Sequence, residues 1–444
     1  MSKVIKKRVV NQPKVKIIAK DKGLTINAGL FPVFRFLSKL SFRDRVDEYT
    51  RVIRGANAVY QFADSVVSVV TGFIAGADSL ENVSVVGSDE TLCKVAGTLP
   101  CGDATTLGRV FRLAKAETVY GLESVVSIFR GKVWKSAIRS GQKLMSFYST
   151  MWIDVDSTVV GVHGDQQGAE KGYNPGKKGE KSYHPLLAFV SETKEVLHSW
   201  FRCGNTYSAN GVTAFMRECM ARVNKRTRVV FRGDSAFFTG ELLDYLDSVK
   251  AGYLIKVKLK NLEELLASQR WAPIQGMNGW ESVDFSHACG NWKKKRRFVA
   301  LRRLKRVEKG LIDLPVYQYF CYVTTEELSP WQVHRTYGKR ATCETWIEEF
   351  KSQLKGCSIR TSDFLANSAL FQCAILAYNV MRWMALLTNR TIQKWEIKTM
   401  RLWLIRMAGK LLTANRQYVL TLPEHFLHRK EWFLWEKTAR NALL

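Results

Sequence analysis

The sequence contains little that could hold a structural zinc ion or a disulfide framework. Its nine cysteines include no C-x-x-C pair and lie far apart along the chain, and its seven histidines are equally dispersed. A zinc site needs such ligands at close and regular spacing. An odd number of widely scattered cysteines is typical of reduced thiols, so we expect a cytoplasmic protein.

Targeting and membrane signals are also missing. The start of the chain is basic, but the continuous apolar core of a secretory signal does not follow it. The most apolar later stretch, 364–387, is interrupted by polar residues and by Arg382. It therefore predicts a buried helix and not a membrane span, and we expect no membrane partner.

Acidic residues are scarce relative to basic ones. The chain has 68 Lys and Arg residues against 40 Asp and Glu residues, which gives a net charge of +28 and a pI of about 9.8. Such an excess favours a polyanionic partner, most often nucleic acid. With 46% hydrophobic residues the chain can still bury large cores, which excludes a wholly disordered basic protein. Its 444 residues predict two or three domains.

Residues 1–25 are rich in lysine, and residues 26–147 have helical patterns. The first segment predicts either a solvated tail or an arm that binds phosphates. Within the second, 88–97 and 103–113 predict two short helices joined by a turn, which is typical of a helix-turn-helix. An ordinary helical hairpin is the alternative. A helix-turn-helix would expose four residues of its second helix to DNA: Thr105, Thr106, Arg109 and Arg112.

The pattern changes near residue 150. Apolar strand-like runs and helical segments follow as far as about residue 258, which predicts a mixed α/β sheet. Residues 259–328 interrupt this pattern with short strand-like pieces, and we interpret them as an inserted β-rich subdomain. The chain is expected to end in helices. A dense basic run in the insertion predicts either a DNA contact or a solvated loop: Lys293, Lys294, Lys295, Arg296 and Arg297.

Three acids lie within or directly after predicted strands. Asp154 and Asp156 are two residues apart in an apolar strand and therefore share one face. Asp234 follows the end of another apolar strand, and ligands bind at that edge of open α/β sheets. Carboxylates from neighbouring strand ends suit Mg²⁺, which prefers oxygen ligands. A structural role is the alternative, because Asp at a strand end is common.

A predicted helix near residue 340 supplies a further charged group. One face would present a carboxylate, two cations and a phenol, a set that suits a phosphodiester at a metal centre. A solvated helix face with salt bridges is the alternative. At about 100° per residue, four residues fall within a sector of about 60°: Tyr337, Arg340, Glu344 and Lys351.

These residues resemble the signature of a known family. The pattern Tyr-x2-Arg-x3-Glu-x6-Lys is found in DDE transposases of bacterial insertion sequences, and this sequence matches it at all four positions. The same family has an Asp-x-Thr strand, matched by 156–158, and a Gly-Asp-Ser motif, matched by 233–235. The segments 168–175 and 181–186 resemble a branch that is distantly related to piggyBac-like transposases.

The resemblance implies an α/β fold in which an RNase H-like catalytic core is interrupted by an all-β insertion domain. An N-terminal helical DNA-binding domain and C-terminal helices would flank this core. The implied divisions are a basic N-terminal arm (1–25), a helical domain with the helix-turn-helix (26–147), the first part of the core (148–258), the insertion domain (259–328), the second part of the core with the motif helix (329–390) and a C-terminal helical region (391–444).

The resemblance also implies chemistry and partners. Asp156, Asp234 and Glu344 would form the catalytic triad and bind two Mg²⁺ ions, for which Mn²⁺ could substitute. Asp154 and Glu348 match the motifs less well and stay as alternatives. The chain would bind the terminal inverted repeats of its element and target double-stranded DNA, as a homodimer in the bacterial cytoplasm at the nucleoid.

By the same resemblance, Arg340 and Lys351 would position phosphates and Tyr337 would orient the strand while DNA is cleaved and joined to a new site. Two other functions remain open: an RNase H-like nuclease without strand transfer, and a non-catalytic helix-turn-helix repressor. In relatives that form DNA hairpins, an aromatic residue of the insertion takes up a flipped base. Three tryptophans are candidates for this role: Trp271, Trp280 and Trp292.

Overall fold

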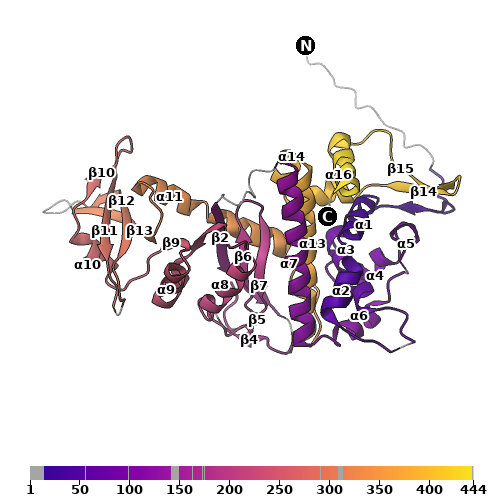
Figure 1. Cartoon of the computed structure of the whole chain (residues 1–444), viewed down its shortest axis with the longest axis horizontal. Helices are drawn as coiled ribbons and strands as arrows, with labels where there is room; N and C mark the ends of the chain where they lie inside the picture. The colour runs from indigo at the N-terminus through magenta and orange to yellow at the C-terminus, as the bar shows by residue number, and fades with distance from the viewer. Residues whose placement is uncertain are drawn as a thin grey trace, which may run out of the picture.

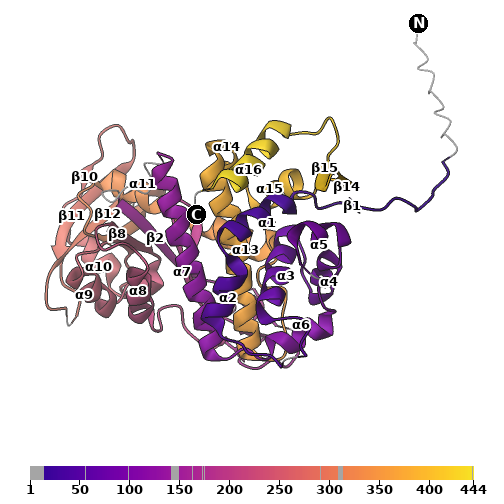
Figure 2. The same cartoon turned by 45° about the vertical axis from the view of Figure 1, so that its right-hand side comes forward.

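The structure is a computed structural model that describes residues 15–55, 57–98, 100–141, 150–162, 164–172, 174, 176–290, 292–308, 314–442 and 444. The described part is elongated, with the N-terminal helices at one end and the inserted strands at the other (Figure 1). Helix α7 (Ala116–Arg139) runs between the N-terminal helices and the sheet (Figure 2).

A mixed sheet forms the middle of the described chain. Its nine strands are β2 (Thr150–Ser157), β6 (Leu186–Val190), β7 (Glu195–Trp200), β8 (Arg228–Gly233), β9 (Gly252–Lys256), β10 (Ala272–Pro273), β11 (Trp280–His287), β12 (Arg296–Glu308) and β13 (Leu314–Thr324). They lie in the order β10-β11-β12-β13-β9-β8-β2-β6-β7. Only the pairs β2–β8 and β8–β9 are parallel. The mixed α/β sheet predicted from the sequence is confirmed.

Alternating side chains along the central strands build one core on each face of the sheet, as the two-residue period of a strand requires. Ile153 of β2 faces a core that includes α8 (Val212–Ala221) and α9 (Gly240–Ser248). Leu187 of β6 faces the other core, which includes α13 (Phe364–Thr388) and α7. The carboxyl ends of β2 and β8 are therefore held by packing on both faces.

Helix α13 is long and apolar enough to cross a membrane, but 89% of its most apolar window is buried inside the protein. It packs against α7 and α3 (Phe62–Ala75) on the helical side and against β7 on the sheet side. This arrangement agrees with the buried helix predicted for 364–387.

The segment 259–328 differs from the expected all-β insertion domain in two ways. It begins with a helix, α10 (Leu262–Ala267), before its strands. In addition, β13 pairs with β9, with Val323 opposite Ile255, so the inserted strands extend the core sheet instead of forming a sheet of their own. The end of β13 and strand β9 both consist mainly of buried apolar residues, which favours their pairing within one sheet.

Short helices make up the N-terminal region. They are α1 (Leu30–Lys39), α2 (Phe42–Thr50), α3, α4 (Leu80–Gly87), α5 (Glu90–Ala96) and α6 (Ala104–Phe111). Asp89 caps α5, and Asp103 caps α6.

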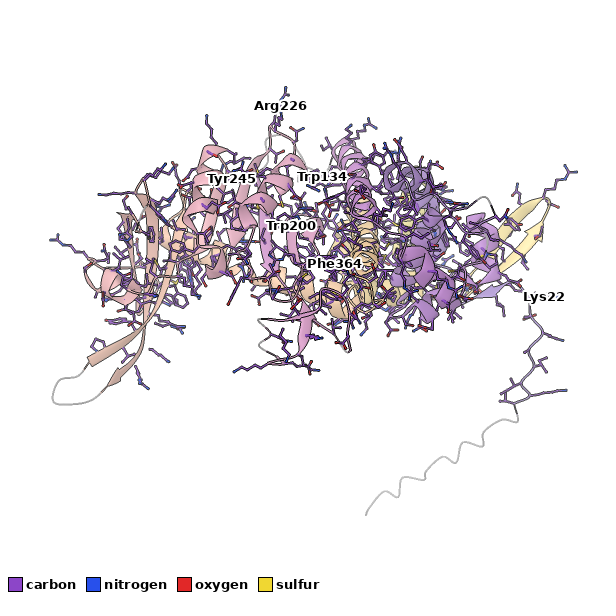
Figure 3. All side chains as sticks on the ribbon, turned by 90° about the horizontal axis from the view of Figure 1, so that it is seen from below. Lys22, Trp134, Trp200, Arg226, Tyr245 and Phe364 are labelled. Atoms are coloured by element: carbon purple, nitrogen blue, oxygen red, sulfur yellow. The ribbon has the colours of Figure 1, made fainter. Side chains whose placement is uncertain are left out.

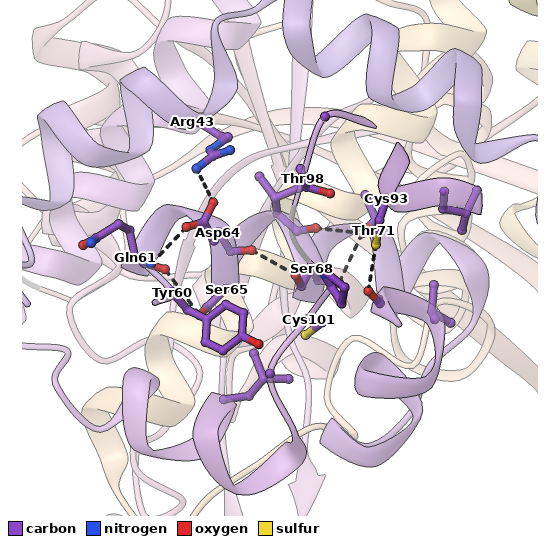
Figure 4. A pocket seen from close by; sticks show the side chains of 18 of the residues that line it. Arg43, Tyr60, Gln61, Asp64, Ser65, Ser68, Thr71, Cys93, Thr98 and Cys101 are labelled. Carbon is purple, nitrogen blue, oxygen red and sulfur yellow. Dashed lines mark hydrogen bonds and ion pairs between the residues drawn. The ribbon is translucent and has the colours of Figure 1, made fainter. Parts of the chain in front are cut away.

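The two helices predicted as a helix-turn-helix have different packing partners. Helix α5 packs against α1, whereas α6 packs against α3, α4 and α13. A pocket of about 260 Å³ lies between α3 and the segment from α5 to α6, and Figure 4 shows Cys93 and Cys101 among the residues that line it. The backbone N–H of Cys101 donates to the carbonyl of Gly87 at 2.9 Å, which ties the connection to the end of α4. Within the described residues, the two predicted helices are therefore held mainly by other elements of the helical region and by α13.

The C-terminal region 391–444 is not wholly helical, contrary to the expectation. Its elements are α14 (Arg390–Lys394), α15 (Ile397–Met400), the π-helix η4 (Arg401–Ile405), β14 (Gly409–Ala414), β15 (Gln417–Thr421) and α16 (Arg429–Asn441). Asn415 and Arg416 both have positive φ between the two strands, which is typical of a tight two-residue hairpin turn. On its other side β14 pairs with β1 (Leu24–Thr25), so the hairpin joins the two ends of the chain.

The polar stretch after β2 folds over itself as a small sheet. Its strands are β3 (Val160–Gly161), β4 (Glu170–Lys171) and β5 (Lys181–Tyr183), in the order β3-β5-β4. Tyr183 packs at 6.0 Å from Phe364 at the start of α13, which anchors this sheet beside the core.

Candidate active site

Two of the predicted acids lie at the carboxyl ends of neighbouring parallel strands. Strands β2 and β8 pair with Asp154 opposite Arg232. Asp156 lies two residues further along β2, and Asp234 directly follows the last residue of β8. The carboxylate of Asp234 accepts a backbone hydrogen bond from the short helix η2 (Ser235–Phe237), which fixes the turn after the strand.

The single helix predicted over the Tyr-Arg-Glu-Lys motif is wrong, because the motif is divided among three pieces. They are α11 (Pro330–Gly338), α12 (Ala341–Glu348) and the π-helix η3 (Glu349–Gln353). Gly338, a poor helix former, ends α11, and the backbone N–H of Arg340 donates to the carbonyl of Tyr337 at 2.8 Å across the break. This break places Arg340 at the start of α12.

The guanidinium of Arg340 joins the three predicted catalytic acids. Its Nη2 lies 2.7 Å from Oδ2 of Asp156 and 3.8 Å from Oδ2 of Asp234, and its Nη1 lies 3.0 Å from Oε1 of Glu344. Arg340 is only 8% exposed, whereas the side chain of Glu344 is 63% exposed. The structure thus brings the three carboxylates around one buried cation, with an opening to solvent on the side of Glu344.

Burial and charge oppose each other at this cluster. Burial raises the pKa of Asp156, and the charge of Arg340 lowers it again, so that it stands at about 6. Burial raises the pKa of Tyr337 to about 12, so its phenol keeps its proton. For Arg340, burial lowers the pKa, but the neighbouring carboxylates of Asp156 and Asp234 outweigh this effect and raise it. Arg340 therefore remains a cation within the acid cluster.

Asp154, the alternative to Asp156, has a different role. It is fully buried, and Arg232 donates two hydrogen bonds to its carboxylate, at 2.6 and 2.7 Å. Arg232 also donates to the backbone carbonyl of Thr336 in α11 at 2.7 Å. This pair fixes α11 against the sheet. Glu348, the alternative to Glu344, is exposed one turn further along α12.

The remaining two motif residues lie beside the acids. Tyr337 packs against Tyr322 of β13, with ring centroids 4.7 Å apart. Lys351 donates from Nζ to the backbone carbonyl of Val159 at 2.8 Å, which ties η3 to the loop after β2. A π-helical turn is rare and often lies at a functional site.

The predicted basic run 293–297 divides into exposed and structural residues. Lys293, Lys294 and Lys295 are exposed in the turn before β12. Arg296 is buried and pairs with Asp244 and Asp247 of α9, at 2.5 and 2.9 Å. Its prediction as a DNA contact is therefore not supported. Arg297 is likewise held by protein groups, namely Asp284 and the backbone carbonyls of Glu326 and Leu328.

Other predicted DNA contacts are accessible. Thr105, Arg109 and Arg112 are exposed on or directly after α6, and Thr106 is half-buried beside its capping residue. Within the described part of the lysine-rich arm, 15–25, residues 15–22 are exposed and extend away from the other described residues past Lys22 (Figure 3), whereas Leu24–Thr25 forms β1. Residues 1–14 of the predicted arm lie outside the described residues.

One cluster of polar side chains was not predicted from the sequence. Among the residues that the structure describes, Glu123 of α7, His198 of β7 and Glu218 of α8 have ligand atoms within 4.8 Å of one another. Burial lowers the pKa of His198 to about 4 and raises that of Glu123 to about 7. Arg222 already pairs with Glu123, and the His198 ring contacts Glu218 at 2.6 Å, so the cluster is satisfied by protein groups. Three residues from distant elements leave no local motif that could have revealed it.

The donor set around Arg340 fits a hard divalent cation. Asp156, Asp234 and Glu344 offer only carboxylate oxygens, the ligands that Mg²⁺ and Mn²⁺ prefer. Three carboxylates against one guanidinium leave an excess of negative charge that favours cation binding.

Comparison with known proteins identifies the family. The family model described as "Transposase DDE domain group 1" matches residues 7–439. The chain belongs to this DDE transposase family. The resemblance inferred from the sequence motifs is thereby confirmed, and the family supports a nuclease or transposase enzyme.

Two further comparisons add less. None of the curated proteins matches the transposase. Among solved structures it is similar to "Cryo-EM structure of piggyBac transposase synaptic complex with hairpin DNA (SNHP)", at 12% identity and a TM-score of 0.45, over 85% of this chain and 79% of that chain. Similarity at this level does not establish a shared fold.

Proposed function

We propose that this transposase binds the terminal inverted repeats of an insertion sequence, cleaves the DNA at the element end and joins the freed end to target DNA. The observation that carries this proposal is the convergence of Asp156, Asp234 and Glu344 on one buried guanidinium. Like charges from three distant parts of the chain repel one another when they converge unless a cation compensates them, so their convergence favours a functional site.

The core of the proposal is an RNase H-like catalytic unit built from β7-β6-β2-β8-β9 and the helices on both faces. In it, β2 is antiparallel to β6 and parallel to β8, which presents Asp156 and Asp234 at one edge. Helix α12 supplies Glu344 to the same edge. The inserted strands β10–β13 and the N-terminal helices would then supply DNA-binding surfaces.

Asp156, Asp234 and Glu344 would hold divalent cations, Mg²⁺ in the cell, with Mn²⁺ as a substitute. When bound, such cations supply Lewis acidity to the phosphodiester. The chain itself has other tasks. Arg340 and Lys351 neutralise phosphate charge, and Tyr337, whose raised pKa keeps its phenol protonated, donates a hydrogen bond to the strand.

DNA contacts are proposed at two ends of the molecule. The exposed lysines 293–295 lie at the insertion, and Arg109 and Arg112 lie on or directly after α6. Each phosphate contact adds to the salt dependence of binding. Because two element ends must be held together for strand transfer, we propose that the complex with DNA is a homodimer.

The three tryptophans that are candidates to take up a flipped base all pack against other side chains, which disfavours this role. Trp292 packs at 5.4 Å from Phe238, Trp280 at 5.7 Å from Phe320, and Trp271 lies under the guanidinium of Arg302. Trp292 is the best placed of the three, because Phe238 follows the η2 turn that begins at Asp234.

The test is incubation of the protein with Mg²⁺ and labelled DNA from the element end, together with unlabelled target DNA. The proposal predicts cleavage at the end and a joined product. Cleavage without joining would favour a nuclease, and binding without cleavage would favour a repressor. Asp234→Ala should abolish cleavage and leave DNA binding near that of the unmodified protein, whereas retained cleavage would refute the triad.

A further inference from the structure

The guanidinium of Arg340 contacts the carboxylates that would hold divalent cations. Its Nη2 lies between Asp156 and Asp234, 2.7 and 3.8 Å from their nearest oxygens. The same two carboxylates would hold a divalent cation through their oxygens. The guanidinium and such a cation cannot share this space, and their like charges repel at short range.

Arg340 has a clear electrostatic task among these acids. Three carboxylates meet here, and Asp156 is largely buried, with 16% of its side chain exposed. Without a positive charge they would repel one another, and burial would add to the cost of keeping them ionised. The guanidinium provides that charge through contacts with all three acids.

The hold on Arg340 is incomplete, however. Its Nη atoms contact the acids, but its buried Nε has no hydrogen-bond partner within the described part of the protein. A buried donor without a partner lowers the stability of this position. Solvent reaches the cluster on one side of Arg340, because the side chain of Glu344 is 63% exposed. The backbone of Arg340 is fixed at the break between α11 and α12, so only the side chain needs to move.

We propose that Arg340 is an exchangeable internal cation. It neutralises the acid cluster while no metal is bound, and it leaves toward solvent and a DNA phosphate when divalent cations enter. This inference rests on the proposed function and deepens it. Since the displaced guanidinium gains a partner only when DNA is present, DNA and metal should each strengthen the binding of the other.

The experiment measures Mn²⁺ binding by electron paramagnetic resonance, with and without duplex DNA of the element end, for the full chain and for Arg340→Gln. Without DNA, the substitution should tighten Mn²⁺ binding by about tenfold or more, because it removes a competing charge. DNA should tighten Mn²⁺ binding to the unmodified protein, and this effect should shrink in the variant. The melting temperature in EDTA should fall in Arg340→Gln and recover with Mn²⁺.

A matched control is Arg228→Gln. Arg228 begins the strand that leads to Asp234, but it does not belong to the acid cluster. Its Nη2 pairs with Oε1 of Glu326 at a distance of 2.6 Å. This control should leave Mn²⁺ binding unchanged. If Arg340→Gln does not fold, Arg340→Lys, which keeps the charge but loses the paired Nη contacts, should give a smaller tightening in the same direction.

Unchanged or weaker Mn²⁺ binding in the Arg340 variants would overturn the exchange. The proposed function is tested separately by Asp234→Asn, which should weaken Mn²⁺ binding in either case. If Asp234→Asn leaves Mn²⁺ binding intact, the metal site itself is wrong. If it weakens binding but the Arg340 variants do not tighten it, only the exchange fails.

Discussion

Arg232 donates two buried hydrogen bonds to the carboxylate of Asp154, while Asp156, on the same face of the same strand, is held by Arg340. The two acids of one Asp-x-Asp strand thus have separate partners. Arg232 links the sheet to α11 through Thr336, and Arg340 links it to α12 through Glu344. We infer that the first pair is structural and the second belongs to the active site.

Substitutions at these two acids should therefore separate stability from activity. Asp154→Ala leaves a buried guanidinium without its partner and should lower the free energy of unfolding by about 3–5 kcal/mol. Asp156→Asn should change that free energy by less than about 1 kcal/mol and abolish DNA cleavage. Urea unfolding and a cleavage assay on both variants check this. Equal losses of stability would contradict the division of roles.

Substitutions in the basic run 293–297 should likewise separate effects on DNA binding from effects on stability. Changing Lys293 and Lys295 to Ala should weaken DNA binding and reduce the slope of log affinity against log salt by about 2, if each contacts one phosphate. Arg296→Ala should instead destabilise the protein, because Asp244 and Asp247 lose their buried partner. Fluorescence anisotropy over a series of salt concentrations and thermal unfolding distinguish the two effects. A salt slope that falls most in Arg296→Ala would contradict the assignment.

Arg401 couples the helical region to the motif. Its guanidinium donates to the backbone carbonyls of Phe73 and Ile74 at the end of α3, and to that of Gln353 in η3 at 2.6 Å. Arg401→Ala leaves these acceptors without their donor and should cost about 3 kcal/mol. Arg401→Lys should recover part of this loss. Chemical unfolding measures the free energy of unfolding of both variants. If Arg401→Ala leaves this free energy unchanged, water has replaced the lost contacts and the prediction is wrong.

The free energy of unfolding should depend on pH through Glu192, whose pKa is raised to about 7, chiefly by burial. The folded state therefore favours the protonated acid, and ionisation above the unfolded value of about 4.3 works against folding. Its contribution to stability should fall as pH rises from about 4.5 to about 7. Glu192→Gln should flatten this part of the profile of unfolding free energy against pH. A profile with unchanged slope would contradict the assignment.

The sequence predicted those features of the site that depend on local pattern. The apolar strands that lead to Asp156 and Asp234 were recognisable from the sequence. Both the alternation of side chains along a strand and the turn that follows it depend on residues close together in the sequence. The motif spacing identified Arg340 and Glu344 even though the helix that was assumed for it breaks at Gly338. Direct contact between a motif arginine and all three acids does not follow from spacing.

Features that depend on distant partners were not predictable. Arg296 resembles its lysine neighbours in sequence, and only the position of α9 makes it a buried partner of Asp244 and Asp247. The C-terminal hairpin turns at Asn415-Arg416, a weaker signal than Asn-Gly. The pairing of β13 with β9 depends on how the insertion returns to the sheet, which no local residue pattern specifies.

The most direct test of the account is the number of Mn²⁺ ions that the protein binds in the presence of element-end DNA. The measurement compares the unmodified chain with the combined variant Asp156→Asn, Asp234→Asn and Glu344→Gln. The account predicts that the unmodified chain binds two ions per protomer, which is the two-metal arrangement, and that the variant loses both while still binding DNA. Equal Mn²⁺ binding by the two proteins would contradict it.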